Sequence, residues 1–518
     1  MSLSCRRTAA SPKPRARTFE ERCNGEQVDP QAEFRCLLDE SCRDRQTLTG
    51  LDRRSNGVDV QRQDENRRPA GGTPLRVLFA TYSERTHFQA MVPLAWAFAA
   101  AGHEVRVASQ PALIDEITRS GLTAVPVGSD HTLWRIASRL LTSRFAGVNP
   151  TAHARLRGID LPPYARCDQP IGPEDWGYLR DGYEEVLAGW HRIVNGPMLD
   201  DLVAFARQWK PHVVLWEPTT HAGAIAAEAV GAVHGRLLWS LDFFGCTRAN
   251  FIRLRDRTVE QDGAGVRLDD PMQAWLAADA ARHGIAFSER LVSGEFTVDQ
   301  YPPTLRLETG LDVVGMRYVP YNGPSSVPPW LRERATQRRV CLTLGQMGVE
   351  RFDEYPVDVS GILSALSDVD AEVIATVAPQ VVETFGTVPD NVRIESFVPL
   401  AALAPTCSAA VHHGGFGTTN TFVRSGVPQV VIAEQHDAPL LAARIERAGA
   451  GRAEHFRTAT PESLRDHVTA LLDDPRYAIG ADKLRAGAAA MPDPPSIAAA
   501  VAARVAAQPR RRTAADSS

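Results

Sequence analysis

The chain has 518 residues, and 44% of them are hydrophobic, which is enough for more than one domain core. Its 62 acidic and 57 basic residues nearly cancel, so the charge balance gives no indication of nucleic acid or of an anionic membrane as a partner. No apolar run approaches a membrane span, no signal-peptide pattern is present, and the eight cysteines show no metal-type CxxC spacing. These features predict a globular cytoplasmic protein.

Residues 1–73 differ from the rest of the chain. They are rich in Arg, Asp, Gln and Pro, poor in aromatic residues, and have no sustained hydrophobic period. We therefore expect a disordered N-terminal extension. A basic targeting or docking arm and a natural translation start near residue 75 stay open as alternatives.

Residues 74–318 alternate between strand and helix patterns, which is typical of a parallel sheet. In chain order the patterns predict a strand at 75–80, a helix at 91–101, a strand at 103–108, a strand at 212–216, a helix at 222–230 and a strand at 235–239. Between these units, residues 130–196 show no clean period, so irregular helices and loops are expected there.

Residues 319–337 are rich in Pro and Gly and are interpreted as an interdomain linker. Residues 338–483 then repeat the alternating pattern, with strands predicted at 339–344, 372–375, 392–394, 409–412 and 429–432. Residues 484–518 are expected to hold a C-terminal helix at about 497–507 and a frayed tail. The fold class indicated is α/β, with two Rossmann-like domains.

A Gly-rich turn follows the predicted strand at 409–412. It reads Val411-His412-His413-Gly414-Gly415-Phe416-Gly417-Thr418 and leads into a helix predicted over 418–424. Small residues let backbone N–H groups approach an oxyanion, and a helix N-terminus carries partial positive charge. The motif thus indicates a diphosphate site, although taken alone it fits a structural loop equally well.

The chain resembles the two-domain, GT-B type nucleotide-sugar glycosyltransferases, and in particular the actinobacterial enzymes that glycosylate macrolides and anthracyclines with help from an activator protein. The resemblance covers about residues 75–507. Besides the Gly-rich turn, it rests on VPLAWAF at Val92–Phe98, AGHEVRV at Ala101–Val107, LWEP at Leu215–Pro218 and GMRYVPYNGP at Gly315–Pro324. It implies a cleft between the two domains and inverting transfer of a deoxysugar from a dTDP-sugar to a hydroxyl of a polyketide-type aglycone.

Two residues are candidates for the catalytic chemistry. His87 aligns with the catalytic-base histidine that these enzymes place just before the first helix, and imidazole suits a base at neutral pH. Glu217 ends the predicted strand at 212–216, where relatives carry an acid that orients the imidazole. The alternatives are a loop histidine that caps the next helix and a strand-end carboxylate that caps the helix after Pro218.

The resemblance implies a further set of donor-binding residues. These are Gly345, Gln346, Phe397, Val398, His413, Gly414, Gly415, Gly417, Thr418 and Asp437. His413 and its glycine loop would hold phosphate, Gly345 and Gln346 would face it, and the loop of Phe397 and Val398 would meet the base, unless that loop is an ordinary strand-to-helix turn. His412 is expected to pack at the strand end.

The sugar-reading position departs from the pattern of hexose-transferring relatives. They carry Asp-Gln where this chain has Asp437-Ala438. A site that lacks a polar reader no longer rewards the hydroxyl that it would read, which favours a deoxysugar donor. No Asp-x-Asp cluster is placed as a diphosphate-metal ligand, so no metal or other cofactor is expected.

The resemblance also implies a protein partner, a cytochrome-P450-like auxiliary activator without working haem. Five aromatic residues of the 130–196 stretch could anchor it, or could instead line the acceptor pocket or fill the core: Trp134, Trp176, Tyr178, Tyr183 and Trp190. Two other functions stay open for the chain, a non-catalytic sugar-nucleotide-binding or regulatory protein and a sugar-nucleotide epimerase of the same architecture.

Overall fold

The computed structural model describes residues 74–140, 163–262, 269–345, 349–350, 355–383, 385, 387–434 and 436–508. The expectations for residues 1–73, for Gln346 and for the tail beyond residue 508 lie outside this part of the chain. The described residues all belong to one compact unit that covers Asn66–Ser518.

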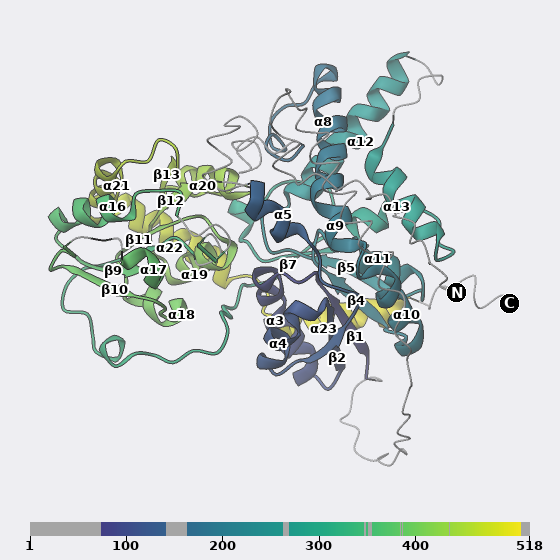
Figure 1. The fold of residues 1–518 in the computed structure, drawn as a ribbon, viewed down its shortest axis with the longest axis horizontal. Coiled ribbons are helices and arrows are strands. Elements are labelled where there is room, and N and C mark those ends of the chain that lie inside the picture. The colour runs from purple at the N-terminus through teal and green to yellow at the C-terminus, as the bar shows by residue number, and fades with distance from the viewer. Residues whose placement is uncertain are drawn as a thin grey trace, which may run out of the picture. The chain divides into compact units, whose positions relative to one another are not determined.

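The first domain is built on a seven-stranded parallel sheet in the order β3-β2-β1-β4-β5-β6-β7 (Figure 1). Its strands are β1 (Arg76–Ala80), β2 (Glu104–Ser109), β3 (Thr123–Pro126), β4 (Val213–Trp216), β5 (Val233–Leu237), β6 (Thr297–Asp299) and β7 (Val313–Gly315). Successive side chains of β1 alternate between two apolar clusters, with Leu78 in one and Val77 and Phe79 in the other. The central strands therefore face a core on both sides, which explains their continuous apolar runs.

The second domain has a six-stranded parallel sheet in the order β10-β9-β8-β11-β12-β13. Its strands are β8 (Arg339–Thr343), β9 (Glu372–Thr376), β10 (Val392–Glu395), β11 (Ala409–His412), β12 (Gln429–Ala433) and β13 (Gly451–His455). The same alternation holds here, because Val340 and Leu342 pack in one cluster and Cys341 packs in another. The two sheets confirm the predicted pair of Rossmann-like domains.

Helices join the strands of both sheets. The longer ones in the first domain are α3 (Arg85–Ala100), α5 (Leu133–Leu140), α8 (Trp176–Val186), α10 (Leu199–Trp209), α11 (His221–Glu228), α12 (Phe243–Asp262) and α13 (Pro271–Ala281), and those in the second are α19 (Phe416–Ser425), α20 (Ala438–Arg447), α21 (Pro461–Asp473) and α22 (Pro475–Ala489). None of the described helices is both long and apolar enough to cross a membrane.

Some expectations about local structure are wrong. Helix α3 begins at Arg85 instead of residue 91, because its first turn is polar and carries no apolar period; His87 therefore lies in the helix and not before it. Strand β5 ends at Leu237, which leaves Trp239 in the following loop. The described residues after 172 are also more regular than expected, since α8, a π-helix at Leu187–His191 and α9 (Arg192–Asn195) follow one another directly.

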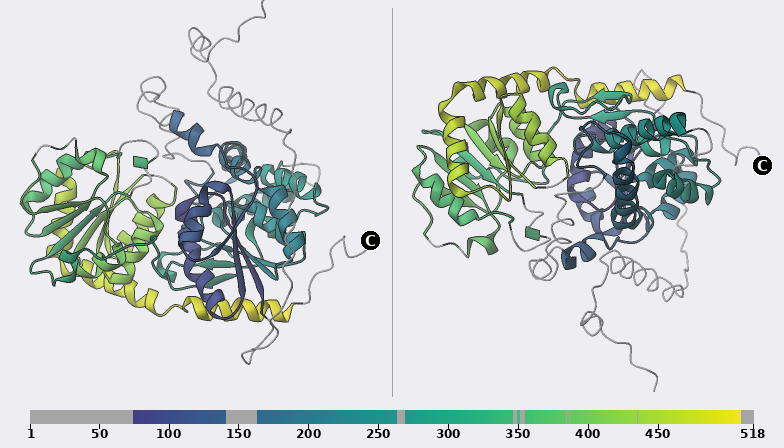
Figure 2. Two further views of the ribbon diagram at one scale, coloured as in Figure 1. Left: turned by 60° about the horizontal axis from the view of Figure 1, so that its bottom comes forward. Right: turned by 90° about the horizontal axis from the view of Figure 1, so that it is seen from above.

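The last helix, α23 (Pro494–Ala507), follows the second domain in sequence but packs against α3 of the first (Figure 2). Ile497, Ala498 and Val501 are at most 2% exposed and belong to the same apolar cluster as Val77 and Phe79. Asp493 caps the helix by accepting a hydrogen bond from the Ser496 N–H at 3.0 Å. The C-terminal segment thus completes the core of the N-terminal domain.

Removing buried volume from this helix should destabilise the protein. We expect Ile497→Ala to lower the free energy of unfolding by about 2–4 kcal/mol, since it leaves a cavity in the core. Ile479→Ala is the matched control, because Ile479 is 55% exposed and its truncation should change stability by no more than about 0.5 kcal/mol. Thermal melting measures both; equal shifts would contradict the packing role of α23.

Candidate active site

Each sheet has a topological switch point, where neighbouring strands lead to connections on opposite sides. In the first sheet it lies between β1 and β4, and in the second between β8 and β11. Ligand crevices of open parallel sheets form at the carboxyl ends of such strands. A cleft of about 640 Å³ is lined by residues that follow these strands in both domains, and it brings the predicted site residues together.

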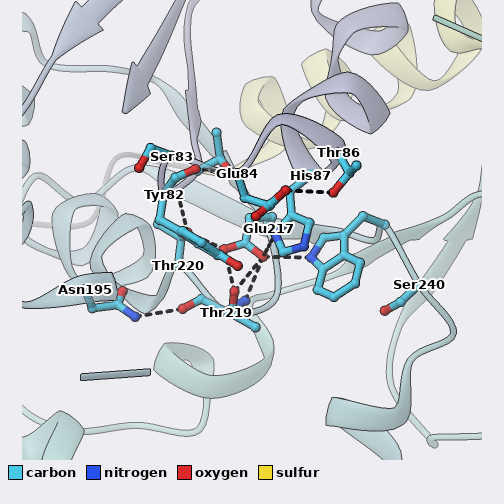
Figure 3. A network of polar contacts seen from close by, with 12 residues as sticks. Tyr82, Ser83, Glu84, Thr86, His87, Asn195, Glu217, Thr219, Thr220 and Ser240 are labelled. Carbon is cyan, nitrogen blue, oxygen red and sulfur yellow. Dashed lines mark hydrogen bonds and ion pairs between the residues drawn. The ribbon is translucent and has the colours of Figure 1, made fainter. Parts of the chain in front are cut away.

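His87 lies in the first turn of α3, just after β1, and lines the cleft. Glu217 directly follows β4, and its side chain is completely buried. Nδ1 of His87 lies 3.4 Å from Oε2 of Glu217 but makes no well-aligned hydrogen bond. The two predicted catalytic residues therefore lie next to each other at the first switch point (Figure 3). Of the two, His87 is the one that lines the cleft.

The carboxylate of Glu217 is held by neutral donors. The Thr219 N–H donates to Oε2 at 3.0 Å, the Thr219 hydroxyl lies 2.8 and 2.9 Å from the two oxygens, and the Thr220 hydroxyl donates to Oε1. Burial raises the cost of ionising Glu217, but His87 and these donors outweigh it and lower its pKa to about 2. Glu217 thus forms a fixed negative charge behind the imidazole.

The loop that carries these threonines is itself anchored. Asn195, at the end of α9, donates to the Thr219 carbonyl at 2.7 Å and accepts from the Ala222 N–H at 2.8 Å. The Thr220 hydroxyl also accepts from the Tyr82 N–H at 2.9 Å, which connects it to the segment between β1 and α3. The loop that orients Glu217 is consequently held by the end of α9 and by the segment after β1.

Trp239 is a site residue that the sequence analysis missed. Its ring stacks on the His87 imidazole, with 3.6 Å between centroids and 13° between planes, and its Nε1–H donates to Oε2 of Glu217 at 2.8 Å. The sequence placed this residue in a strand, where its side chain would pack against the sheet. The one available signal was that Trp239 lies at the carboxyl end of a predicted parallel strand, as His87 and Glu217 do.

The Gly-rich turn lies at the second switch point. His413 lines the cleft after β11, and both Gly345, which follows β8, and Gly415 lie close to its ring. A Cβ at Gly345 would lie 2.7 Å from Cε1 of His413, and one at Gly415 would also collide with the ring. Both glycines therefore leave room for the Nε2–Cε1 edge of the imidazole in this position. Burial lowers the pKa of His413, against the opposing effect of the Thr343 carbonyl.

His412 plays the packing role that its position indicated. It is fully buried, accepts at Nδ1 from the Gly414 N–H at 3.0 Å, and contacts Oε1 of Gln429 through Nε2 at 2.7 Å. Burial lowers its pKa to about 3, so the ring is neutral with its proton on Nε2. Gly414, with a φ of +84°, turns the chain after this histidine toward the N-terminus of α19.

The remaining predicted donor residues border the same cleft. Phe397 is 44% exposed while Val398 beside it is buried, and Gly417 and Thr418 lie in the first turn of α19. Asp437 is the N-cap residue of α20. The structure thus places every described donor candidate at this cleft.

Asp437 also contacts the other domain. The Leu241 N–H donates to its Oδ2 at 2.9 Å. Burial raises the pKa of Asp437 to about 7, against this hydrogen bond. Next to it, His436 has a φ of +55° and meets the Trp190 ring edge-on at 5.5 Å between centroids.

Two family models match the chain. The N-terminal domain of "Erythromycin biosynthesis protein CIII-like" proteins matches residues 96–345, and their C-terminal domain matches residues 360–504. The chain belongs to the erythromycin CIII-like family of glycosyltransferases. It is 45% identical over 439 residues to the 10-deoxymethynolide desosaminyltransferase of Streptomyces venezuelae, covering 84% of this chain and 98% of the relative.

A second relative of this family, the aklavinone 7-beta-L-rhodosaminyltransferase of Streptomyces galilaeus, is 41% identical over 455 residues, or 85% of this chain and 97% of the relative. Among solved structures, the glycosyltransferase VinC in complex with dTDP aligns with a TM-score of 0.70 and 36% identity, over 84% of this chain and 100% of VinC. The spinosyn forosaminyltransferase SpnP aligns with a TM-score of 0.68 and 33% identity, over 84% and 100%. The GT-B fold and the glycosyltransferase class are therefore established.

In the part of the chain that the structure describes, no three His, Cys, Asp or Glu side chains are grouped so that they could hold a metal ion. The expectation of metal-independent transfer stays a prediction.

The raised pKa of Asp437 has a measurable consequence for stability. A carboxyl with a folded pKa of about 7 and an unfolded pKa of about 3.9 contributes stability that is present below pH 4 and is lost as the pH rises through 7. Asp437→Asn should therefore gain stability relative to the wild type between pH 5 and pH 8, on the order of 2 kcal/mol.

Asp474→Asn is the control for this prediction. Asp474 also caps a helix, but its hydrogen bonds from Arg476 lower its pKa, so it is ionised throughout this range. Melting temperatures of the three proteins at several pH values measure the effect. A gap between Asp437→Asn and the wild type that does not change with pH would contradict the burial argument.

Proposed function

We propose that the chain is an inverting glycosyltransferase that moves a deoxysugar from a dTDP-sugar to a hydroxyl of a polyketide-type aglycone. The observation that carries this proposal is the placement of the His87–Glu217 pair and the His413 loop on the two sides of one cleft. A base on one domain can deprotonate the acceptor hydroxyl, and an anion site on the other can stabilise the leaving diphosphate. This arrangement suits displacement at a sugar carbon held between the two domains.

The proposed reaction follows from this geometry. Nδ1 of His87 faces Glu217, which leaves Nε2 on the other side of the ring for the acceptor hydroxyl. The hydroxyl oxygen attacks the anomeric carbon, its proton passes to Nε2, and the bond between that carbon and the diphosphate oxygen breaks. The acceptor hydroxyl would be held at the first domain and the diphosphate at the second. Attack on the anomeric carbon therefore occurs from the face opposite the diphosphate, which inverts the configuration.

The leaving diphosphate would be stabilised by the His413 loop. Backbone N–H groups at Gly415 to Thr418, including the N-terminus of α19, supply the partial positive charge. Two cationic side chains line the cleft among the described residues, and each pairs with a glutamate: Arg85 with Glu350 at 3.0 Å and Arg119 with Glu116 at 2.8 Å. The proposal therefore assigns the diphosphate to backbone and imidazole donors.

The sugar and aglycone are proposed from the lining and from the relatives. Asp437 offers one acidic side chain to the sugar, while Ala438 beside it is buried against Gly414 and offers no polar group. Aromatic rings line the first-domain side: Tyr82, Trp134, Trp190 and Trp239. These surfaces suit a sugar with few hydroxyls and a large apolar acceptor. The relatives named above carry desosaminyl and rhodosaminyl transfer in their names.

The auxiliary cytochrome-P450-like activator is proposed on family likeness alone. The aromatic residues that could have anchored it do not form an open surface: Tyr183 is 1% exposed, Trp176 and Tyr178 pack against the core, and Trp134 and Trp190 line the cleft. The structure thus favours the alternative in which these rings serve the core and the pocket.

The experiment that tests the function is a mass-spectrometric transfer assay. Purified protein is incubated with a panel of dTDP-deoxysugars and polyketide aglycones, with and without a co-expressed auxiliary protein, and in excess EDTA. A glycosylated aglycone whose anomeric configuration is inverted, formed also in EDTA, is expected. Conversion of the donor without any aglycone would instead indicate an epimerase.

We expect His87→Ala to reduce turnover by about 10²–10⁴-fold, because a general base contributes a factor of this size. Its dTDP affinity should stay within about twofold of the wild type, since His87 lies on the other domain from the anion site. Single-turnover rates and calorimetric dTDP titration measure both quantities. Unchanged turnover would refute the assignment.

His413→Ala should, in contrast, weaken the binding of dTDP. We expect dTDP affinity to fall by about tenfold or more, because a hydrogen bond to a charged oxygen is lost. Thr421→Val is a suitable control, since Thr421 lies on α19, the helix that follows the His413 loop, but is buried and donates to the Gly417 carbonyl. Equal dTDP affinity in wild type and His413→Ala would mean that the loop is structural.

A further inference from the structure

Trp239 contacts both members of the catalytic pair at once. Its indole ring lies flat against His87, and its N–H donates to Oε2 of Glu217, the same oxygen that faces Nδ1 of His87. Trp239 also lines the cleft. A single side chain thus restrains the plane of the base and shares the oxygen on which the base depends.

This sharing has a chemical consequence. A bare buried carboxylate beside an imidazole would stabilise the imidazolium strongly, and a histidine that stays protonated cannot accept a proton from the acceptor. Each neutral donor on the carboxylate withdraws part of its charge from the imidazole. The Trp239 N–H does so at the oxygen nearest to His87, while the Thr219 hydroxyl lies between both oxygens.

We propose that Trp239 is a positioning residue that keeps His87 available as a base, by holding the imidazole plane and by taking up part of the hydrogen-bonding capacity of Glu217. The proposal rests on the transferase function proposed above. Trp239 acts through His87 and does not itself react. Its contacts would help to set the pH range in which the enzyme is active.

Other titratable groups surround the pair and stay in place when Trp239 is changed. Glu84 precedes α3 and accepts from the Thr86 hydroxyl, and Tyr82 meets the His87 ring edge-on at 5.2 Å. Across the cleft lies Asp437. Behind the carboxylate, His191 and His221 interact electrostatically with Glu217, and burial lowers their pKa values to about 3 and about 4, so both are neutral near pH 7.

The test is Trp239→Phe, which keeps an aromatic face over the imidazole and removes the N–H. Glu217 then interacts more strongly with the imidazolium, so the protonation midpoint of His87 should rise by roughly 0.5–1 pH unit. The weaker cation–π attraction of Phe acts in the opposite direction but is the smaller effect for a ring that still stacks. The acid limb of kcat/KM should move to higher pH by the same amount, with dTDP affinity unchanged.

The control is Trp209→Phe. The Trp209 N–H also donates to a glutamate, Glu104, at 3.2 Å, but on the exposed side of the first domain and outside the cleft. It should leave the profile where it is. Thr219→Val removes a different donor from Glu217 and should move the limb in the same direction as Trp239→Phe, which guards against a fold defect specific to position 239.

Two measurements keep the outcomes apart. The pH profile of transfer needs an active enzyme, whereas titration of the ¹³Cε1 histidine signal, assigned with His87→Gln, follows His87 without any turnover. A rise of the midpoint in Trp239→Phe supports the proposal even where no substrate has been found. An unchanged midpoint in both Trp239→Phe and Thr219→Val would overturn it, and failure of the wild type to transfer any sugar would count against the proposed function instead.

Discussion

The arrangement of the residues at the first-domain side of the cleft depends on the buried carboxylate of Glu217. A charge in a protein interior is tolerated only when its hydrogen bonds are satisfied. Here the loop that follows β4 supplies them from Thr219 and Thr220, and the indole of Trp239 adds one more. The conformation of this loop, the position of His87 and the loop after β5 are therefore all constrained by one ionised group.

The loop after β5 extends this constraint to the second domain. Two residues beyond Trp239, the Leu241 N–H donates to Asp437 at the start of α20. One short segment consequently contacts His87 and Glu217 through Trp239, and Asp437 of the second domain through Leu241.

Much of this arrangement could be predicted from the sequence. Buried parallel strands leave continuous apolar runs, and these runs indicated the strands. The roles of His87, Glu217 and His413 were implied by the family resemblance, and the structure places all three after the strands that flank the two switch points. The helix containing His87 could not be bounded, because the first turn of α3 faces the cleft and lacks an apolar period. Tertiary contacts, and not local pattern, decide such a boundary.

Trp239 and the aromatic residues of 130–196 show the other limit of the sequence. An indole that stacks on an imidazole and donates to a carboxylate looks, in sequence, the same as one that fills a core. The end of β5 also had to be known to within two residues before Trp239 could be placed in a loop. Conversely, the rings that suited a protein interface by composition pack in or against the core of the first domain or line the cleft.

A double-mutant cycle on His87 and Glu217 tests the central claim most directly. Values of kcat/KM are compared for the wild type, His87→Ala, Glu217→Gln and the double variant, with melting temperatures to verify folding. If Glu217 acts through the base, its substitution should slow the wild type by about tenfold or more and have almost no further effect once His87 is gone. An equal loss in both backgrounds would show that the carboxylate acts independently of His87 and would contradict the account.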